Sequence, residues 1–173
     1  MMKFLRRAIA MNRYRPRVIA ALAITGLALL GLIALVQQDK TSQAADAMPR
    51  GRLVIETASG TLHLDVEIAR TREQRSQGLM FRTSLDRDSG MIFIYDSPRE
   101  VSMWMKNTIL SLDMAFIAED GRITRIVANT TPMSEATLPS RGPVRAVLEL
   151  LAGTAKRLAI KPGDHVGFDD LDG

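Results

Sequence analysis

The sequence predicts an α+β fold in which strands predominate. A β-rich compact single domain is expected behind an N-terminal transmembrane or signal helix, as a mostly antiparallel sheet or a small barrel with two short helices. Two observations carry this prediction. An uncharged apolar run occupies residues 18–36, and the stretches that follow show strand-like patterns more often than helix-like ones. The 173 residues suffice for one domain and a leader, which excludes a multidomain machine.

The N-terminal part of the chain predicts a membrane location. Residues 1–17 contain six basic residues and no acidic one, and form a basic leader. As an α-helix, residues 18–36 would be about 28 Å long, close to the roughly 30 Å hydrocarbon core of a bilayer. Because Lys and Arg remain on the cytoplasmic side, the N-terminus is expected in the cytoplasm and the domain in the periplasm or another extracytoplasmic space. We therefore expect a cell-envelope protein whose partner through residues 18–36 is the membrane.

Whether residues 18–36 stay as an inner-membrane anchor or are removed as a signal peptide is left open. Small residues at 42–44 and 45–47 suit a signal peptidase, but the apolar run exceeds the roughly 7 to 15 residues of a signal peptide. Residues 37–50 are polar and small, which is typical of a linker.

Charge and cysteine content exclude several classes of function. Six of the 23 Lys and Arg residues lie in the leader, so the other 17 are balanced by 19 acidic residues, and no nucleic-acid partner is expected. The absence of cysteine excludes disulfides, thiolate zinc sites and cysteine nucleophiles.

Residues 51–173 are predicted to form the β-rich domain. Alternating apolar and polar residues predict a half-buried strand over 61–68, which pairs with a strand over 52–57 through a hairpin. A capping-box pattern from Thr71 to Gln74 predicts a short helix. The apolar run 91–95 predicts a central strand covered on both faces. The remaining expected elements are strands over 101–106, 112–118, 122–128, 144–150 and 165–168, a loop over 130–143 and a helix over 154–160.

Several short motifs occur once each in this domain and are informative as a set. They are Gln77–Arg82, Gly90–Phe93, Met103–Thr108 with Leu112 and Asp113, Asn129, Val147–Gly153 and Ile160–Asp164. In this order and spacing they resemble the family called domain of unknown function 192, over about residues 54–168. The resemblance implies a compact β-rich domain, often exported, and no established activity.

The polar residues around one apolar strand are the best candidates for a site. An ionised Asp113 between apolar neighbours costs several kcal/mol unless it is paired, so a partner is expected, with Lys106 the nearest cation and Arg82 a second option. One interpretation is structural, a charge pair or hydrogen bonds that fix the turn after Lys106. The other is a cleft lined by Trp104, Lys106, Asn107 and Arg82 for a small polar or anionic ligand. The candidate ligand-binding residues are Arg82, Trp104, Lys106, Asn107, Thr108, Asp113 and Asn129.

Three kinds of function remain open. We favour binding of a small polar ligand or of a partner protein in the envelope. The alternatives are a hydrolase or lyase that uses Asp113 and Lys106 as acid–base groups, and a structural or assembly factor. No cofactor or metal is expected. His63, Asp65 and Glu67 share one face of a strand, but neighbouring positions there are about 6.6 Å apart, wide for a common ion without help from another strand. The domain methionines are interpreted as core residues rather than as copper ligands.

Overall fold

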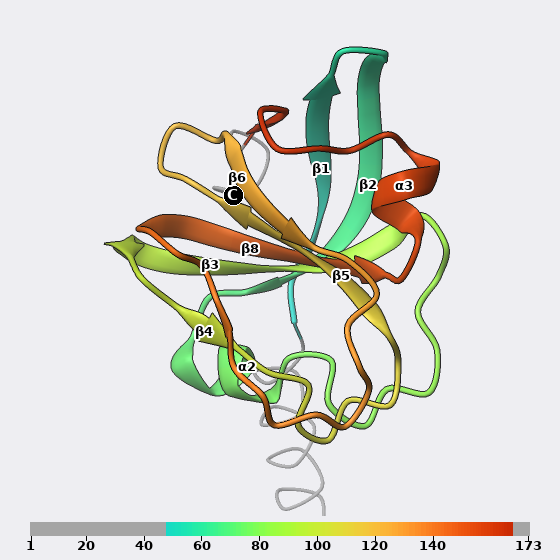
Figure 1. Cartoon of the computed structure of the whole chain (residues 1–173), viewed down its shortest axis with the longest axis vertical. Helices are drawn as coiled ribbons and strands as arrows, with labels where there is room; N and C mark the ends of the chain where they lie inside the picture. The colour runs from blue at the N-terminus through green and yellow to red at the C-terminus, as the bar shows by residue number, and fades with distance from the viewer. Residues whose placement is uncertain (1–47, 168–173) are drawn as a thin grey trace, which may run out of the picture. The chain divides into compact units, whose positions relative to one another are not determined.

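A curled seven-stranded sheet forms the framework of residues 48–167, the part of the chain that our computed structural model describes (Figure 1). The strand order is β6-β5-β8-β3-β2-β1-β9, and every neighbouring pair is antiparallel except β2 and β3. The sheet is therefore mixed, although mostly antiparallel as predicted. Its strands are β1 (Arg50–Thr57), β2 (Gly60–Ala69), β3 (Ser89–Arg99), β5 (Leu112–Ile117), β6 (Ile123–Val127), β8 (Val144–Leu151) and β9 (His165–Gly167).

The sheet curls into a half-barrel whose two edge strands meet at one point. An isolated bridge joins Arg122, just before β6, to His165 in β9. The amide of Val166 donates to the carbonyl of Gly121 over 2.8 Å. Gly121 has φ +84°, and a Cβ there would lie 2.4 Å from the Val166 carbonyl oxygen, so this junction requires a residue without a side chain.

Two short helices accompany the sheet, as predicted. In α2 (Arg72–Gln77) the expected capping box is present: the Gln74 amide donates to Thr71 Oγ1 over 3.1 Å, and the Thr71 amide donates to Gln74 Oε1 over 3.0 Å. The second helix, α3 (Thr154–Arg157), is shorter than the predicted 154–160. It ends early because Ala159 adopts a left-handed backbone conformation with φ 57°.

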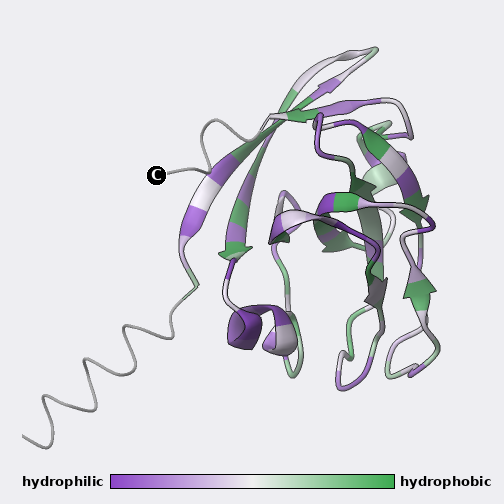
Figure 2. Ribbon diagram, turned by 90° about the vertical axis from the view of Figure 1, so that its left-hand side faces the viewer, coloured by the Kyte–Doolittle hydropathy of each residue, from purple (hydrophilic) through white to green (hydrophobic). Residues whose placement is uncertain are grey.

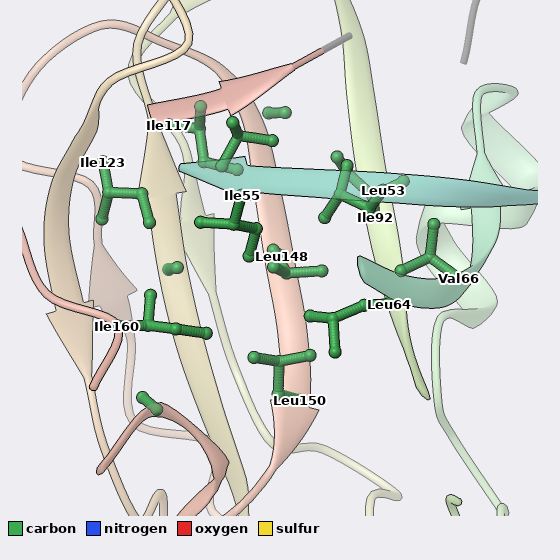
Figure 3. Packing of buried hydrophobic residues seen from close by; sticks show 14 of the residues in the cluster. Leu53, Ile55, Leu64, Val66, Ile92, Ile117, Ile123, Leu148, Leu150 and Ile160 are labelled. Carbon is green, nitrogen blue, oxygen red and sulfur yellow. The ribbon is translucent and has the colours of Figure 1, made fainter. Parts of the chain in front are cut away.

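Side chains of the sheet pack on both of its faces. Ile92 and Ile94 belong to the first core cluster, enclosed by the curl of the sheet (Figure 3). Met91, Phe93 and Tyr95 point the other way, into a second cluster. The prediction that this strand is covered on both faces is therefore confirmed.

The second cluster is covered by loops rather than by another sheet. Leu79, after α2, and Met105 are buried in it, and Leu110 packs against it. A two-stranded ribbon, β4 (Ser102–Met103) with β7 (Leu138–Pro139), adds to this cover. These covering segments contain most of the candidate site residues.

The strand predicted over 101–106 is wrong beyond its first residues, because only Ser102–Met103 pair as β4. The chain turns directly afterwards: the amide of Thr108 donates to the carbonyl of Met105 over 3.1 Å, and Asn107 has φ 54°. A turn here carries Lys106 away from the strand direction that the apolar alternation suggested.

The domain begins slightly earlier than residue 51. Met48 packs against the second core cluster, and the Pro49 carbonyl accepts a hydrogen bond from the Ile68 amide over 2.7 Å. Within residues 48–167 no helix is long and apolar enough to cross a membrane. The leader and the apolar segment predicted over 18–36 lie outside the described residues.

Candidate functional site

A pocket of about 130 Å³ opens between α2, β3 and the loop that carries β4. Tyr95 and Trp104 supply aromatic walls, and Thr108 and Met103 lie beside them. The carboxyl-bearing residue of this pocket is Glu149, from β8. The lining mixes these side chains with polar ones from α2 and β4, among them Arg75, Gln77 and Ser102.

Glu149 is a charged residue type in a nearly apolar environment. It lies on the face of β8 that carries the second core cluster, opposite Met91 on one neighbouring strand and Met114 on the other. The residue is 4% exposed, and within residues 48–167 its carboxyl group has no hydrogen-bond or ion-pair partner. Burial raises the pKa of Glu149 to about 8. A buried, unpaired carboxyl group that reaches a pocket is a strong candidate for ligand recognition.

Two arginine side chains pack against the ring of Tyr95, which forms one wall of the pocket. The guanidinium groups of Arg75 and Arg99 lie 5.1 and 5.3 Å from the ring centre. Arg75 Nη1 also donates to the Ile94 carbonyl over 2.9 Å. Burial raises the pKa of Tyr95, although the two guanidinium groups partly offset this effect. Tyr95 is therefore a neutral wall, and Arg75 is committed to contacts within the protein.

Two of the predicted site residues, Trp104 and Thr108, line this pocket. Lys106 and Asn107 lie next to it rather than in its lining. Lys106 Nζ is 5.2 Å from the Trp104 ring centre and 3.7 Å from Glu135 Oε1. The Asn107 amide nitrogen is 3.9 Å from the sulfur of Met80, and its left-handed backbone fixes the turn.

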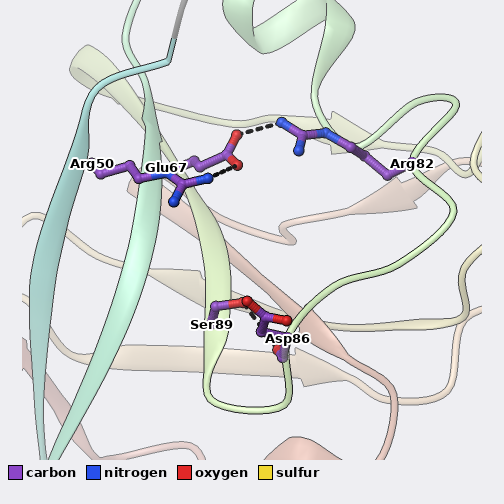
Figure 4. Close-up of polar contacts among 5 residues, drawn as sticks. All are labelled: Arg50, Glu67, Arg82, Asp86 and Ser89. Carbon is purple, nitrogen blue, oxygen red and sulfur yellow. Dashed lines mark hydrogen bonds and ion pairs between the residues drawn. The ribbon is translucent and has the colours of Figure 1, made fainter.

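Arg82 lies at a different place, so one cleft lined by Arg82, Trp104, Lys106 and Asn107 is not formed. Its Nη2 atom pairs with Glu67 Oε2 at 2.6 Å, and Arg50 approaches the other oxygen of Glu67 at 3.5 Å (Figure 4). These residues line a separate cavity of about 470 Å³. Since Glu67 is already paired on both oxygens, this larger cavity is a weaker candidate than the pocket with the unpaired Glu149.

Asp113 has the partners that its burial requires, but they are backbone amides. Its Oδ1 atom accepts from the Asn129 amide and its Oδ2 atom accepts from the Ala155 amide, both over 2.9 Å. The first contact holds the left-handed turn at Asn129, and the second holds the first turn of α3. These hydrogen bonds fix loops, but at Asn129 and α3 rather than at the turn after Lys106, and Lys106 pairs with Glu135 instead.

Sequence reasoning missed Glu149, although the motif Val147–Gly153 contains it. The signal was present. Glu149 lies in the strand VRAVLELL between two leucines, and the burial argument that drew attention to Asp113 applies equally there. The sequence pattern could not tell whether Asp113 or Glu149 has hydrogen-bond partners in the fold.

Replacement of Asp113 should test its structural role. Asp113→Ala leaves two amides without their acceptor, and hydrogen bonds to charged groups contribute about 1.5 to 3 kcal/mol each, so the free energy of unfolding should fall by about 3 kcal/mol or more. Lys106→Ala, on a half-exposed cation, should change it by less than about 1 kcal/mol. Urea denaturation measures both. Equal losses in the two variants would contradict this assignment.

Comparisons with known proteins agree with the fold. A crystal structure from Sinorhizobium meliloti 1021, described as a candidate transcription regulator, is 51% identical, with a TM-score of 0.68 over 70% of this chain and 95% of that one. A protein of unknown function from Novosphingobium aromaticivorans DSM 12444 is 43% identical, with a TM-score of 0.65 over 67% of this chain and 83% of that one. No curated protein matches the chain. Residues 53–168 match domain of unknown function 192, described as an uncharacterized ACR, COG1430, and the chain belongs to this family.

Proposed function

We propose that the domain binds a small organic molecule that places an ammonium or another hydrogen-donating group against Glu149. The observation that carries this proposal is the buried carboxyl group, without a partner among the described residues, in the lining of this pocket. A hydrogen bond to a charged group contributes about 1.5 to 3 kcal/mol, which a ligand with a matching donor would gain here. This proposal keeps the expected small polar ligand but assigns its recognition to a residue outside the predicted set.

The chemistry of the lining favours a cation over an anion. An anion would have to bind beside a carboxyl group that becomes negative above about pH 8, and Arg75 already donates to two backbone carbonyls. An amine can accept the proton of Glu149 and remain beside it as an ion pair. Trp104, whose ring also meets the Lys106 ammonium at 5.2 Å, lines the pocket and supplies aromatic contact area for the ligand.

Glu149 should make stability depend on pH. Its pKa is raised from the ordinary 4.5 to about 8, so between these values the folded protein holds a proton that the unfolded chain releases. The free energy of unfolding of the parent should therefore fall as pH rises from about 4.5 to 8, by a few kcal/mol, and level off above. Glu149→Gln should remove this slope and be the more stable protein at pH 8. Denaturation curves across pH measure it, with the exposed Glu135→Gln as a matched control that keeps the slope.

A thermal-shift series tests the ligand class. Small primary alkylamines such as butylamine should raise the melting temperature of the parent, while neutral isosteres that donate no hydrogen, such as methyl propyl ether, should not. Glu149→Gln and Trp104→Ala should each lose the shift. Asp88→Asn, in the larger cavity, should retain it. Equal stabilisation by the neutral isosteres, or a shift that survives in Glu149→Gln, would refute binding of a cation by Glu149.

We also propose that residues 18–36 attach or export the domain, so that the pocket meets extracytoplasmic ligands. The uncharged apolar run and the basic leader support this location. Fusions of the full chain to two reporters test it. A C-terminal reporter that is active only outside the cytoplasm should give signal, and one that is active only in the cytoplasm should not. The reverse pattern would place the domain inside the cell.

Regulation of transcription, suggested by the description of the Sinorhizobium protein, is not the function we favour. The two helices within residues 48–167 are six and four residues long, too short for a recognition helix that lies along a major groove. Outside the leader, basic and acidic residues are nearly balanced, whereas DNA-binding surfaces are strongly basic.

A further inference from the structure

Large apolar side chains are exposed at one end of the domain. Among residues 48–167, the exposed large hydrophobic residues are Phe81 (72%), Met133 (55%), Ile109 (50%) and Trp104 (46%). They come from the segment after α2, the turn before β5 and the loop between β6 and β7. These segments appear in green, yellow and orange at the bottom of Figure 1, and the same end of the domain is at the bottom of Figure 2.

Backbone hydrogen bonds hold these segments side by side. The Phe81 amide donates to the Asn107 carbonyl over 2.9 Å, and the Met133 amide donates to the Thr108 carbonyl over 2.9 Å. Ile109 follows directly in the chain. Phe81, Ile109 and Met133 therefore form one surface, which we call the apolar loop face, with Trp104 and the pocket close by.

Two residues of the apolar loop face also occupy a costly backbone conformation. Phe81 has φ 63° and Met133 has φ 60°, in the left-handed region where residues other than glycine and asparagine lose roughly 1 to 2 kcal/mol. Both side chains point into solvent, so no core packing compensates for this strain. Exposed apolar groups on strained backbone indicate a surface shaped for an interaction.

The place where the chain enters the domain suggests what this face meets. Arg50, at the start of β1, and Arg82, next to Phe81, both contact Glu67 (Figure 4). The entry point is thus beside the apolar loop face. Residues 37–47 separate it from the apolar run 18–36, and eleven residues reach at most about 40 Å, or roughly 20 Å as a flexible coil. A membrane anchor at 18–36, part of the function proposed above, would keep this face near the bilayer.

We propose that the apolar loop face docks on a phospholipid bilayer, with Phe81, Ile109 and Met133 in the interface between headgroups and acyl chains. Apolar side chains at loop tips can enter that interface while the backbone remains hydrated. Lys106 and Arg82 lie next to the face. Each pairs with a carboxylate, Glu135 or Glu67, which a lipid phosphate would have to displace. Docking of this kind would set the distance of the neighbouring pocket from the membrane surface.

Vesicle binding tests the proposal on residues 48–173. The domain is suited to this experiment because the Sinorhizobium chain, covered to 95%, consists of little else. The parent should bind phosphatidylcholine–phosphatidylglycerol vesicles at millimolar lipid. Trp104, the single tryptophan of the sequence, should shift to shorter emission wavelengths and be quenched by brominated lipids.

A double variant separates binding from folding. Phe81→Asn with Met133→Asn removes apolar surface and places asparagine where the left-handed backbone suits it, so the melting temperature should stay or rise. Its half-saturating lipid concentration should rise at least tenfold. The matched control is Ala159→Asn, an exposed left-handed position elsewhere, which should bind as the parent does.

Several results would overturn the proposal. They are a parent that leaves vesicles unbound, a double variant that binds as tightly as the parent, a double variant that melts at a clearly lower temperature, or a parent that dimerises through this face instead. Glu149→Gln should bind vesicles normally. Vesicle binding would therefore be unaffected if the pocket bound no cation. Equally, a lack of vesicle binding would not contradict ligand binding by the pocket.

Discussion

Burial of both faces of the central strands is the constraint on which the rest of the structure depends. β3, β5 and β8 carry apolar side chains on both sides, and the curl of the sheet covers only one. The other face must be shielded by α2 and long loops, which are irregular and leave gaps. The pocket is one such gap, and the apolar loop face is the outer surface of the same cover. The features to which we assign function thus arise from one packing requirement.

Two buried carboxyl groups on adjacent strands illustrate how environment decides a role. Asp113 on β5 and Glu149 on β8 are close in the ladder, where Met114 is the direct neighbour of Glu149. Asp113 accepts two amide hydrogen bonds and serves the fold. Glu149 has no such partners within the described residues and reaches a cavity. The cost of burying it makes sense if an occupant provides the missing donor.

The regular elements could be predicted because they depend on local patterns. The alternation over 61–68, the apolar run 91–95 and the capping box at Thr71 each have a strand or helix in the expected place. The conformations of the loops could not be predicted, because they depend on contacts between residues far apart in the sequence. Apolar alternation over 101–106 resembled a strand, yet the backbone turns where Asn107 adopts a left-handed conformation. For the same reason, the partners of Asp113 are the distant backbone amides of Asn129 and Ala155 rather than Lys106, the nearest cation in the sequence.

The meeting of β6 and β9 has a consequence for solubility. β9 is three residues long, yet it pairs with the free side of β1, and the bridge to Arg122 brings the other edge strand to the same place. Unpaired strand edges attract strands from other molecules and nucleate aggregates. β9 therefore covers the free edge of β1 and lies against the start of β6, the strand at the other edge of the sheet. Proteolysis before His165 would uncover β1 and leave a fold prone to edge-to-edge association.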